Sequence, residues 1–399
     1  MDKTSTKELA LFGGQPAFGE LLHVGRPNIG DRARFIARIN DMFDRRWLSN
    51  DGPFAQELER KIAALLGVKH CLVMCNATVA LEITSRALGL QGEVILPSFT
   101  FVASPHSLQW QGITPVFCDI DPLTHNIDPA RIENLITPRT TGILGVHVWG
   151  RACEIEKLGA LAQKHHLKLM FDAAHAFGCT HHGQRVGGFG DAEVFSFHAT
   201  KFFNTFEGGV VTTNDDVLAG KIRGMRNFGF AGLDKVTSIG TNGKMSEASA
   251  AMGLTSLESM DGFIETNHHN YLAYSKGLGG LPGTRLIKYD EKEKNNFQYI
   301  VLEVEEKEAG LGRDLLVKIL HAENILVRRY FYPGCHQMEP YRSYFPNAGL
   351  VLPETEKLTL KVLQLPTGTA VGEKEINDIC RLIRFVFAHA AEIRERAAQ

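Results

Sequence analysis

The sequence predicts an α/β protein in which a mostly parallel sheet is covered by helices on both faces, followed by a smaller α+β domain. Seven short apolar runs, separated by helix-like stretches, occupy roughly residues 70 to 215. Beyond Leu281 the pattern changes to fewer strands mixed with helices. The chain of 399 residues is long enough for two domains, because single cores stop growing at about 250–300 residues.

The predicted strands are apolar along most of their length. Strands of a parallel sheet have this pattern because helices cover both of its faces. Helix-like stretches at Thr78–Leu88 and Glu154–His165 separate several of them. Antiparallel members stay open, since short connections after Gly178 and Gly209 would allow hairpins. The seven runs are Cys71–Met74, Glu93–Leu96, Thr114–Ile120, Thr141–Val148, Leu167–Phe171, Ala192–Phe197 and Gly209–Thr213.

The second domain is predicted from a helical stretch that leads out of the first. Ser246–Ser256 continues as a helix through Ile264–Leu278. We therefore expect an N-terminal arm and a large domain over residues 1–260, and a small C-terminal domain over residues 261–399. The strands and helices expected in the small domain are Gln298–Glu303, Leu360–Leu365, Gly312–Glu323 and Glu373–Ala391.

Composition excludes several classes of partner. The net charge is −2, with no basic excess to attract nucleic acid. No stretch approaches the roughly 20 apolar residues of a membrane span, and Met1–Glu8 lacks the apolar core of a leader peptide. The seven cysteines are odd in number and scattered, which favours a reducing compartment. We expect a cytoplasmic protein with no nucleic-acid or membrane partner.

Asp172 and Lys201 are the most informative pair of residues. Asp172 ends one apolar run, and Lys201 closely follows the run Ala192–Phe197. Two strands that end side by side would bring this acid and this amine into one cleft. A Schiff-base amine and a carboxylate that holds a pyridinium proton are the two fixed needs of pyridoxal phosphate chemistry. Taken alone, Lys201 would be an ordinary exposed lysine and Asp172 the N-cap of a helix beginning at Ala173.

A phosphate site is indicated beside this pair. Asn76-Ala77-Thr78 follows a strand and opens a helix, whose N-terminal N–H groups attract anions. The alternative is a simple N-cap by Asn76 or Thr78. Ser196 would add a hydroxyl to the same phosphate. Phe101, at the end of another strand, has a ring that could stack on a flat cofactor, although core packing is the usual role of phenylalanine.

Three weaker patterns are given lesser roles. His181-His182 is expected to face solvent, with no carboxylate or cysteine completing a metal site, so no metal is predicted. The glycine-rich segment 187–190 lacks the spacing of a dinucleotide fingerprint. Arg328-Arg329 is expected to be a solvated pair, with anion binding as the alternative.

These residues together resemble the DegT/DnrJ/EryC1/StrS family of sugar aminotransferases, which have the aspartate-aminotransferase fold type I. The likeness spans nearly the whole chain in long, ordered blocks. The blocks are Trp47–Pro53, Asn76–Leu81, Pro97–Phe101, Phe171–Gly178, Phe195–Lys201, Glu207–Gly209 and Gly240–Glu247.

The resemblance implies a role for each residue near the cofactor ring. Lys201 would form the Schiff base with pyridoxal 5'-phosphate, and Asp172 would pair with the pyridine nitrogen. His175 would face the ring hydroxyl, where many members of the family carry glutamine. Phe101 would stack on the ring.

The resemblance also implies a shared site at a subunit interface. Ala77, Thr78 and Ser196 would hold the cofactor phosphate, with Asn242 reaching in from the second subunit of a homodimer. Ala77 replaces the usual glycine of the family. A contact between its backbone N–H and the phosphate does not depend on the side chain. Lys244 stands where many members have arginine, which leaves its substrate contact open.

The closest likeness is to enzymes that aminate dTDP-4-keto-6-deoxyglucose at the fourth carbon, with L-glutamate as donor. That implies deoxysugar biosynthesis for an O-antigen or antibiotic glycan. Amination of a 3-keto nucleotide sugar and a non-catalytic regulatory protein remain alternatives. A sugar dehydratase of the family would replace Lys201 by histidine, and a cysteine desulfurase would need a reactive thiol, for which Cys335 is the candidate. The segments that carry the closer likeness are Phe195–Lys201, Asn227–Phe230 and Pro333–His336.

Overall fold

A mixed sheet of seven strands forms the centre of the larger part of the molecule. The computed structural model describes residues 3–398, so Met1, Asp2 and Gln399 of the two predicted domains lie outside the described residues. The strand order is β2-β10-β9-β6-β5-β3-β4. Within this sheet β10 runs antiparallel to both neighbours, and the other pairs are parallel. The predicted α/β class and mostly parallel sheet are confirmed. The strands are β2 (His70–Met74), β3 (Glu93–Pro97), β4 (Thr114–Cys118), β5 (Thr140–Val146), β6 (Lys168–Asp172), β9 (Ala192–Ser196) and β10 (Gly209–Thr213).

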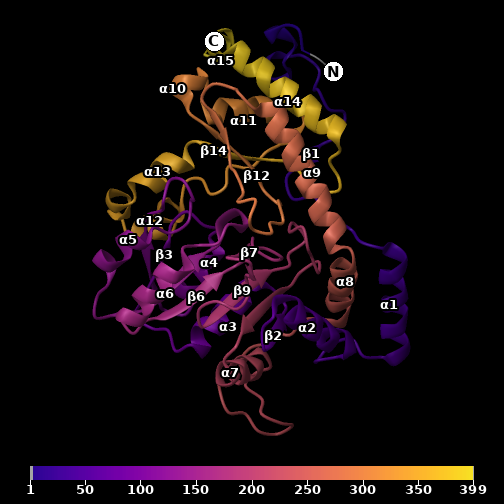
Figure 1. Ribbon diagram of the computed structural model, residues 1–399, viewed down its shortest axis with the longest axis vertical. Coiled ribbons are helices and arrows are strands. Elements are labelled where there is room, and N and C mark those ends of the chain that lie inside the picture. The colour runs from indigo at the N-terminus through magenta and orange to yellow at the C-terminus, as the bar shows by residue number, and fades with distance from the viewer. Residues whose placement is uncertain (1–2, 399) are drawn as a thin grey trace.

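Helices cover both faces of this sheet (Figure 1). Successive strand side chains point to opposite faces, so Leu72 packs with one group of helices and Val73 with the other. This two-sided burial explains why the strands are nearly continuously apolar. The first face carries α3 (Ala77–Ala87), α4 (Ala103–Gln109) and α7 (Asp216–Arg226), and the second carries α2 (Pro53–Leu66), α6 (Ile155–Lys164) and α8 (Glu247–Glu258).

The C-terminal part has its own three-stranded antiparallel sheet, β11-β12-β14. In Figure 1 it lies above the large sheet, with α9 running between the two parts. Its core also takes in Leu9 and Leu22 from the N-terminal segment. The elements of this part are β11 (Thr284–Leu286), β12 (Ile300–Val304), β14 (Val362–Leu365), α9 (Met260–Leu278), α10 (Glu306–Ala309), α11 (Arg313–Ala322), α12 (Tyr341–Tyr344), α13 (Pro353–Thr359), α14 (Glu373–Ala388) and α15 (Ala390–Ala397).

The N-terminal segment joins the C-terminal part through a strand pair. β1 (Leu22–His23) runs parallel to β13 (Ile325–Leu326). A hairpin of β7 (Thr180–His181) and β8 (Gln184–Arg185) stands apart from the large sheet. The short helix α5 (Pro129–Ile132) precedes β5. The N-terminal pairing brings residues 24–28 close to the sheet edge described below.

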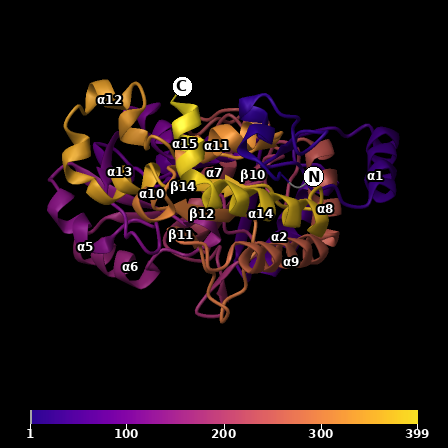
Figure 2. The ribbon, with the colours of Figure 1, turned by 90° about the horizontal axis from the view of Figure 1, so that it is seen from above.

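Two predicted helices are interrupted. The helix expected from Ser246 onward breaks at Ser259, which ends α8 and begins α9. The helix expected over Glu373–Ala391 breaks at His389, where α14 gives way to α15. At one side of the molecule α1 (Arg32–Arg45) stands beside α8 (Figures 1 and 2). No helix among residues 3–398 is long and apolar enough to cross a membrane.

Candidate active site

The predicted amine and acid meet at the carboxyl ends of neighbouring strands. Asp172 ends β6, and Lys201 lies in the turn that follows β9, the strand beside β6. Both side chains line one cavity, which we call the sheet-edge cavity. Crevices at this edge of open α/β sheets are the usual ligand sites of such folds. The prediction that strand ends bring these two groups into one cleft is confirmed.

The Lys201 amine is held in a partly buried position. Its Nζ donates a hydrogen bond to the Tyr299 hydroxyl at 3.1 Å. Burial lowers the pKa of the Lys201 ammonium group to about 8, and the negative charge of Asp172 opposes part of this shift. A larger fraction of the amine is therefore neutral at physiological pH than for an exposed lysine, and the neutral amine is the nucleophilic form.

The Asp172 carboxylate is buried and fully engaged. Ser104 Oγ donates to Oδ2 at 2.7 Å, and the Ala174 backbone N–H donates to Oδ1 at 3.0 Å. Burial raises the pKa of Asp172, while these hydrogen bonds and the charge of Lys201 act in the opposite direction. The alternative role of Asp172 as a helix N-cap is wrong, because residues 173–178 form turns and begin no helix.

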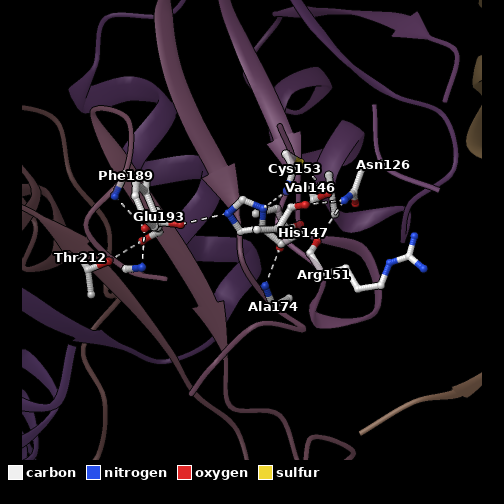
Figure 3. Close-up of polar contacts among 12 residues, drawn as sticks. Asn126, Val146, His147, Arg151, Cys153, Ala174, Phe189, Glu193 and Thr212 are labelled. Carbon is white, nitrogen blue, oxygen red and sulfur yellow. Dashed lines mark hydrogen bonds and ion pairs between the residues drawn. The ribbon is translucent and has the colours of Figure 1, made fainter. Parts of the chain in front are cut away.

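A buried histidine–glutamate pair, His147 and Glu193, adjoins the strand that ends in Asp172 (Figure 3). The His147 backbone N–H donates to the Asp172 carbonyl at 3.0 Å. The Cys153 N–H donates to His147 Nδ1 at 3.0 Å, so Nε2 carries the proton that meets Glu193 Oε1 at 3.1 Å. Glu193 also accepts the Phe189 N–H at 2.9 Å. This network fixes the end of β5 against the strand that carries Asp172.

The N-terminus of α3 lines the same cavity. Asn76 Oδ1 accepts the Val79 N–H at 2.8 Å, so Asn76 does cap the helix, as one alternative supposed. Ala77 and Thr78 nevertheless line the cavity. A side chain at Gly209 would lie 2.6 Å from the Ala77 nitrogen, so glycine there allows the close approach of β10 to this helix end. The free N–H groups of the helix can hold an anion.

The two predicted ring contacts differ in exposure. Phe101 is 54% exposed at the cavity wall, so it does not serve the core. His175 is buried, and its Nδ1 accepts the Trp149 N–H at 3.2 Å. Burial, with the nearby charge of Lys201, lowers the pKa of His175 well below its usual value. A neutral imidazole therefore faces the cavity.

Seven of the eight predicted site residues line this one cavity. The exception is Asn242, which lies on the loop after α7 and forms a β-bridge with Asn227. Lys244 is engaged with the same loop, because its Nζ donates to Asn227 Oδ1 at 2.9 Å. The seven that meet are Ala77, Thr78, Phe101, Asp172, His175, Ser196 and Lys201.

Sequence reasoning missed Ser104 and Tyr299. Ser104 lies in α4, three residues after Phe101, and its hydroxyl gave no signal of its own. Tyr299 falls inside the predicted strand Gln298–Glu303, where an aromatic residue is typical of a core position. In the folded chain Ser104 contacts Asp172, and Tyr299 contacts Lys201. Only these contacts show that the two residues belong to the site.

The structure also shows the surroundings of His181-His182 and of Cys335. The expectation that no carboxylate accompanies His181-His182 is wrong, because Glu156 Oε1 lies 3.0 Å from His181 Nε2 and 3.8 Å from His182 Nε2. Helix α6 brings Glu156 to the hairpin turn, a contact that local sequence does not reveal. Cys335 is fully buried, and burial raises the pKa of its thiol to about 12, which is typical of an inert cysteine.

Comparison with known proteins identifies the chain at the family level. The model of the DegT/DnrJ/EryC1/StrS aminotransferase family matches residues 30–384. The chain belongs to this family. As a DegT/DnrJ/EryC1/StrS protein it is an enzyme of the transaminase class, and its seven-stranded sheet has the predicted fold type I.

Relatives within the DegT/DnrJ/EryC1/StrS family share most of their length with this chain. It is 39% identical to a dTDP-4-amino-4,6-dideoxy-D-glucose transaminase of Shigella dysenteriae over 91% of this chain and 98% of that protein. It is 36% identical to a GDP-perosamine synthase of Caulobacter vibrioides, over 86% and 92%. The crystal structure of DesI in the presence of its TDP-sugar product matches with a TM-score of 0.95 and 48% identity, over 99% of this chain and 100% of that one.

Proposed function

We propose that the protein is a pyridoxal phosphate-dependent aminotransferase that moves the amino group of L-glutamate to the C-4 keto group of a dTDP-linked 4-keto-6-deoxy sugar. The single observation that carries the proposal is the sharing of one cavity by the Lys201 amine and the buried Asp172 carboxylate. These are the two groups on which pyridoxal phosphate chemistry depends.

The donor set of the cavity fits this cofactor. The N-terminus of α3, with Thr78 and Ser196, supplies N–H and hydroxyl groups for its phosphate. Asp172 is the acceptor for its ring N–H, and its two oxygens are already oriented by Ser104 and Ala174. Phe101 offers a ring face. When bound, the cofactor supplies an electron sink in its ring and a carbon that carries the amino group from a donor to a carbonyl.

Each protein group then has a defined task. Asp172, whose anionic form is favoured by its two hydrogen bonds, would keep the proton on the ring nitrogen. Lys201 Nζ, with its lowered pKa, would take a proton from the α-carbon of the donor and return it to the cofactor carbon on the other side of the donor nitrogen. Tyr299 accepts a hydrogen bond from that amine and holds it at the cavity wall. The neutral His175 ring would face the ring hydroxyl of the cofactor, as the family resemblance implies.

The substrate assignment rests on the relatives. The 39% identical relative is named for dTDP-4-amino-4,6-dideoxy-D-glucose, and DesI was crystallised with a TDP-sugar. A GDP-linked 4-keto sugar is the second candidate, because a GDP-perosamine synthase is 36% identical. Both candidates place the new amine on a nucleotide-linked sugar.

The proposal includes a homodimer in which Asn242 reaches the cofactor phosphate of the second subunit. Supporting it, Asn242 is exposed and lies outside the sheet-edge cavity of its own chain. Exposed apolar side chains on the same loop fit burial against a second copy. They are Phe228, Phe230, Leu233, Val236 and Ile239.

A substrate panel tests the proposal. The protein, loaded with pyridoxal phosphate and given L-glutamate, should aminate dTDP-4-keto-6-deoxyglucose, with product followed by mass spectrometry and 2-oxoglutarate by a coupled assay. Lys201→Ala is the inactive control. Turnover of 3-keto sugars alone would overturn the C-4 assignment. Cofactor binding without turnover on any keto sugar would favour a regulatory protein instead.

A further inference from the structure

A second cavity adjoins Lys201 and is distinct from the one already described. It lies between the N-terminal segment and the chain that follows β14. We call it the arginine chamber. Lys201, Arg328 and Tyr330 line both cavities, so the two meet at the reactive amine. The residues that line the chamber and not the sheet-edge cavity include Arg26, Asn28, Asn267, Gln298, Gln364 and Gly368.

The charges of the chamber are unbalanced. Arg26, Arg328 and Lys201 line it, and no aspartate or glutamate does. Within the described chain, neither guanidinium forms an ion pair with a carboxylate. Arg328 lies over the ring of Tyr330 at 5.6 Å, whereas its neighbour Arg329 pairs with Asp314 at 3.0 Å. The alternative of an anion-binding Arg328 is therefore favoured over that of a solvated pair.

Two buried oxygen atoms in the chamber wall also lack partners. Asn267 Oδ1 and Gln364 Oε1 accept no hydrogen bond from any residue of the described chain, although these side chains are only 1% and 3% exposed. Buried polar atoms in folded proteins are normally paired. The chamber thus offers cations and hydrogen-bond acceptors together. The carboxylates of an amino acid complement the guanidinium cations, and its one amino group is directed to the reaction at Lys201, which lines both cavities.

We propose that the arginine chamber binds the amino donor and selects a dicarboxylic amino acid. Arg328, which lines both cavities, holds the carboxylate next to the reacting nitrogen. Arg26, which lines the chamber alone, holds the distal carboxylate. Guanidinium groups match carboxylates with two parallel hydrogen bonds. This inference rests on the proposed aminotransferase function and adds the residues that choose the donor.

Equilibrium binding to the holoenzyme tests the assignment without turnover. Glutarate, with two carboxylates, and butyrate, with one, are titrated calorimetrically into the wild type, Arg26→Gln, Arg26→Lys, Arg328→Gln and the control Arg329→Gln. Arg26→Gln should weaken glutarate on the order of tenfold or more and leave butyrate nearly unchanged. Arg26→Lys should lose less, and Arg328→Gln should weaken both ligands. Arg329→Gln should match the wild type.

Opposite results would overturn the inference. An unchanged preference for glutarate over butyrate in Arg26→Gln would do so, provided that its thermal midpoint shows a folded protein. So would an Arg328→Gln variant that loses affinity for dTDP while keeping glutarate, because that guanidinium would then serve the nucleotide. Normal glutarate binding with no amination of any keto sugar would instead contradict the proposed sugar substrate and leave the chamber assignment intact.

Discussion

The two cavities that meet at Lys201 are built from opposite kinds of polar group. In the sheet-edge cavity Asp172 accepts two hydrogen bonds, and its strand is braced by the pair His147 and Glu193. In the arginine chamber two guanidinium groups form no ion pair with a carboxylate of the described chain, and two buried amide oxygens accept no hydrogen bond from it. One cavity is complete before a ligand arrives, and the other becomes complete with one.

This difference matches what each ligand requires. A resident cofactor gains from groups that are oriented in advance, because no reorganisation is needed when charge moves on its ring. A donor that must leave as a different molecule in every cycle is served by a site whose groups are satisfied only while it is present. We therefore expect changes in the sheet-edge cavity to alter chemistry or folding, and changes in the chamber to alter donor affinity.

The largest effect is expected from Asp172→Asn. An amide cannot hold the proton on the cofactor nitrogen, so turnover should fall on the order of 10³-fold. Glutarate binding should stay at the wild-type level, because Asp172 does not line the chamber. Steady-state kinetics and calorimetry on the same preparation measure both quantities. A parallel loss of glutarate affinity would contradict the claim that the two cavities bind their ligands independently.

Glu193→Ala should destabilise the fold strongly. It removes a buried carboxylate that accepts hydrogen bonds from His147 and Phe189, and breaking such a pair costs about 3–5 kcal/mol. Glu156→Ala is the matched control, since it breaks an exposed pair with His181 worth under about 1 kcal/mol. Urea unfolding of both variants measures the difference. Equal, small losses would contradict the bracing role of Glu193.

Gln364→Met should stabilise the free protein slightly and leave glutarate binding near the wild-type level, because glutarate has no hydrogen-bond donor for the oxygen that is lost. It removes an unpartnered buried oxygen, a change worth about 1 kcal/mol. Asn296→Leu is the contrast, because Asn296 bonds the carbonyls of His175 and Phe177 and should lose stability. Thermal unfolding and glutarate titration report the two effects. A Gln364→Met protein that is less stable than the wild type would contradict the chamber description.

The last expected effect is a pH dependence. The neutral Lys201 amine captures the cofactor, and its pKa of about 8 means that capture by cofactor-free protein should quicken about tenfold from pH 7 to pH 9. Asp172→Asn should move this profile to lower pH, because the carboxylate raises the pKa of Lys201. Stopped-flow absorbance follows the reaction. A shift to higher pH would mean that the Asp172 carboxylate lowers the pKa of Lys201, which contradicts the account.

Much of the fold was accessible from sequence because its signals are local. The strands are continuous apolar runs, and Asp172 and Lys201 could be paired because each follows such a run. The helix cap, the alternative role considered for Asp172, is not formed. Its carboxylate accepts a local hydrogen bond from the Ala174 N–H and a tertiary one from Ser104, and no helix begins after it.

The arginine chamber was not accessible in the same way. Arg26 and Arg328 lie far apart in the chain and meet only because β1 pairs with β13. No periodicity reports such a contact. Asn267 and Gln364 sit at positions that sequence marks as an ordinary helix and strand. Their unpartnered oxygens are a property of the folded chain alone.

The most direct test of the central claim is the site of covalent attachment of the cofactor. The protein is loaded with pyridoxal phosphate, reduced with borohydride and digested, and the modified peptide is identified by mass spectrometry. We predict a single stable adduct on Lys201, absent from Lys201→Ala, which should release its cofactor on denaturation. An adduct on another lysine, or an unchanged adduct in Lys201→Ala, would contradict the account.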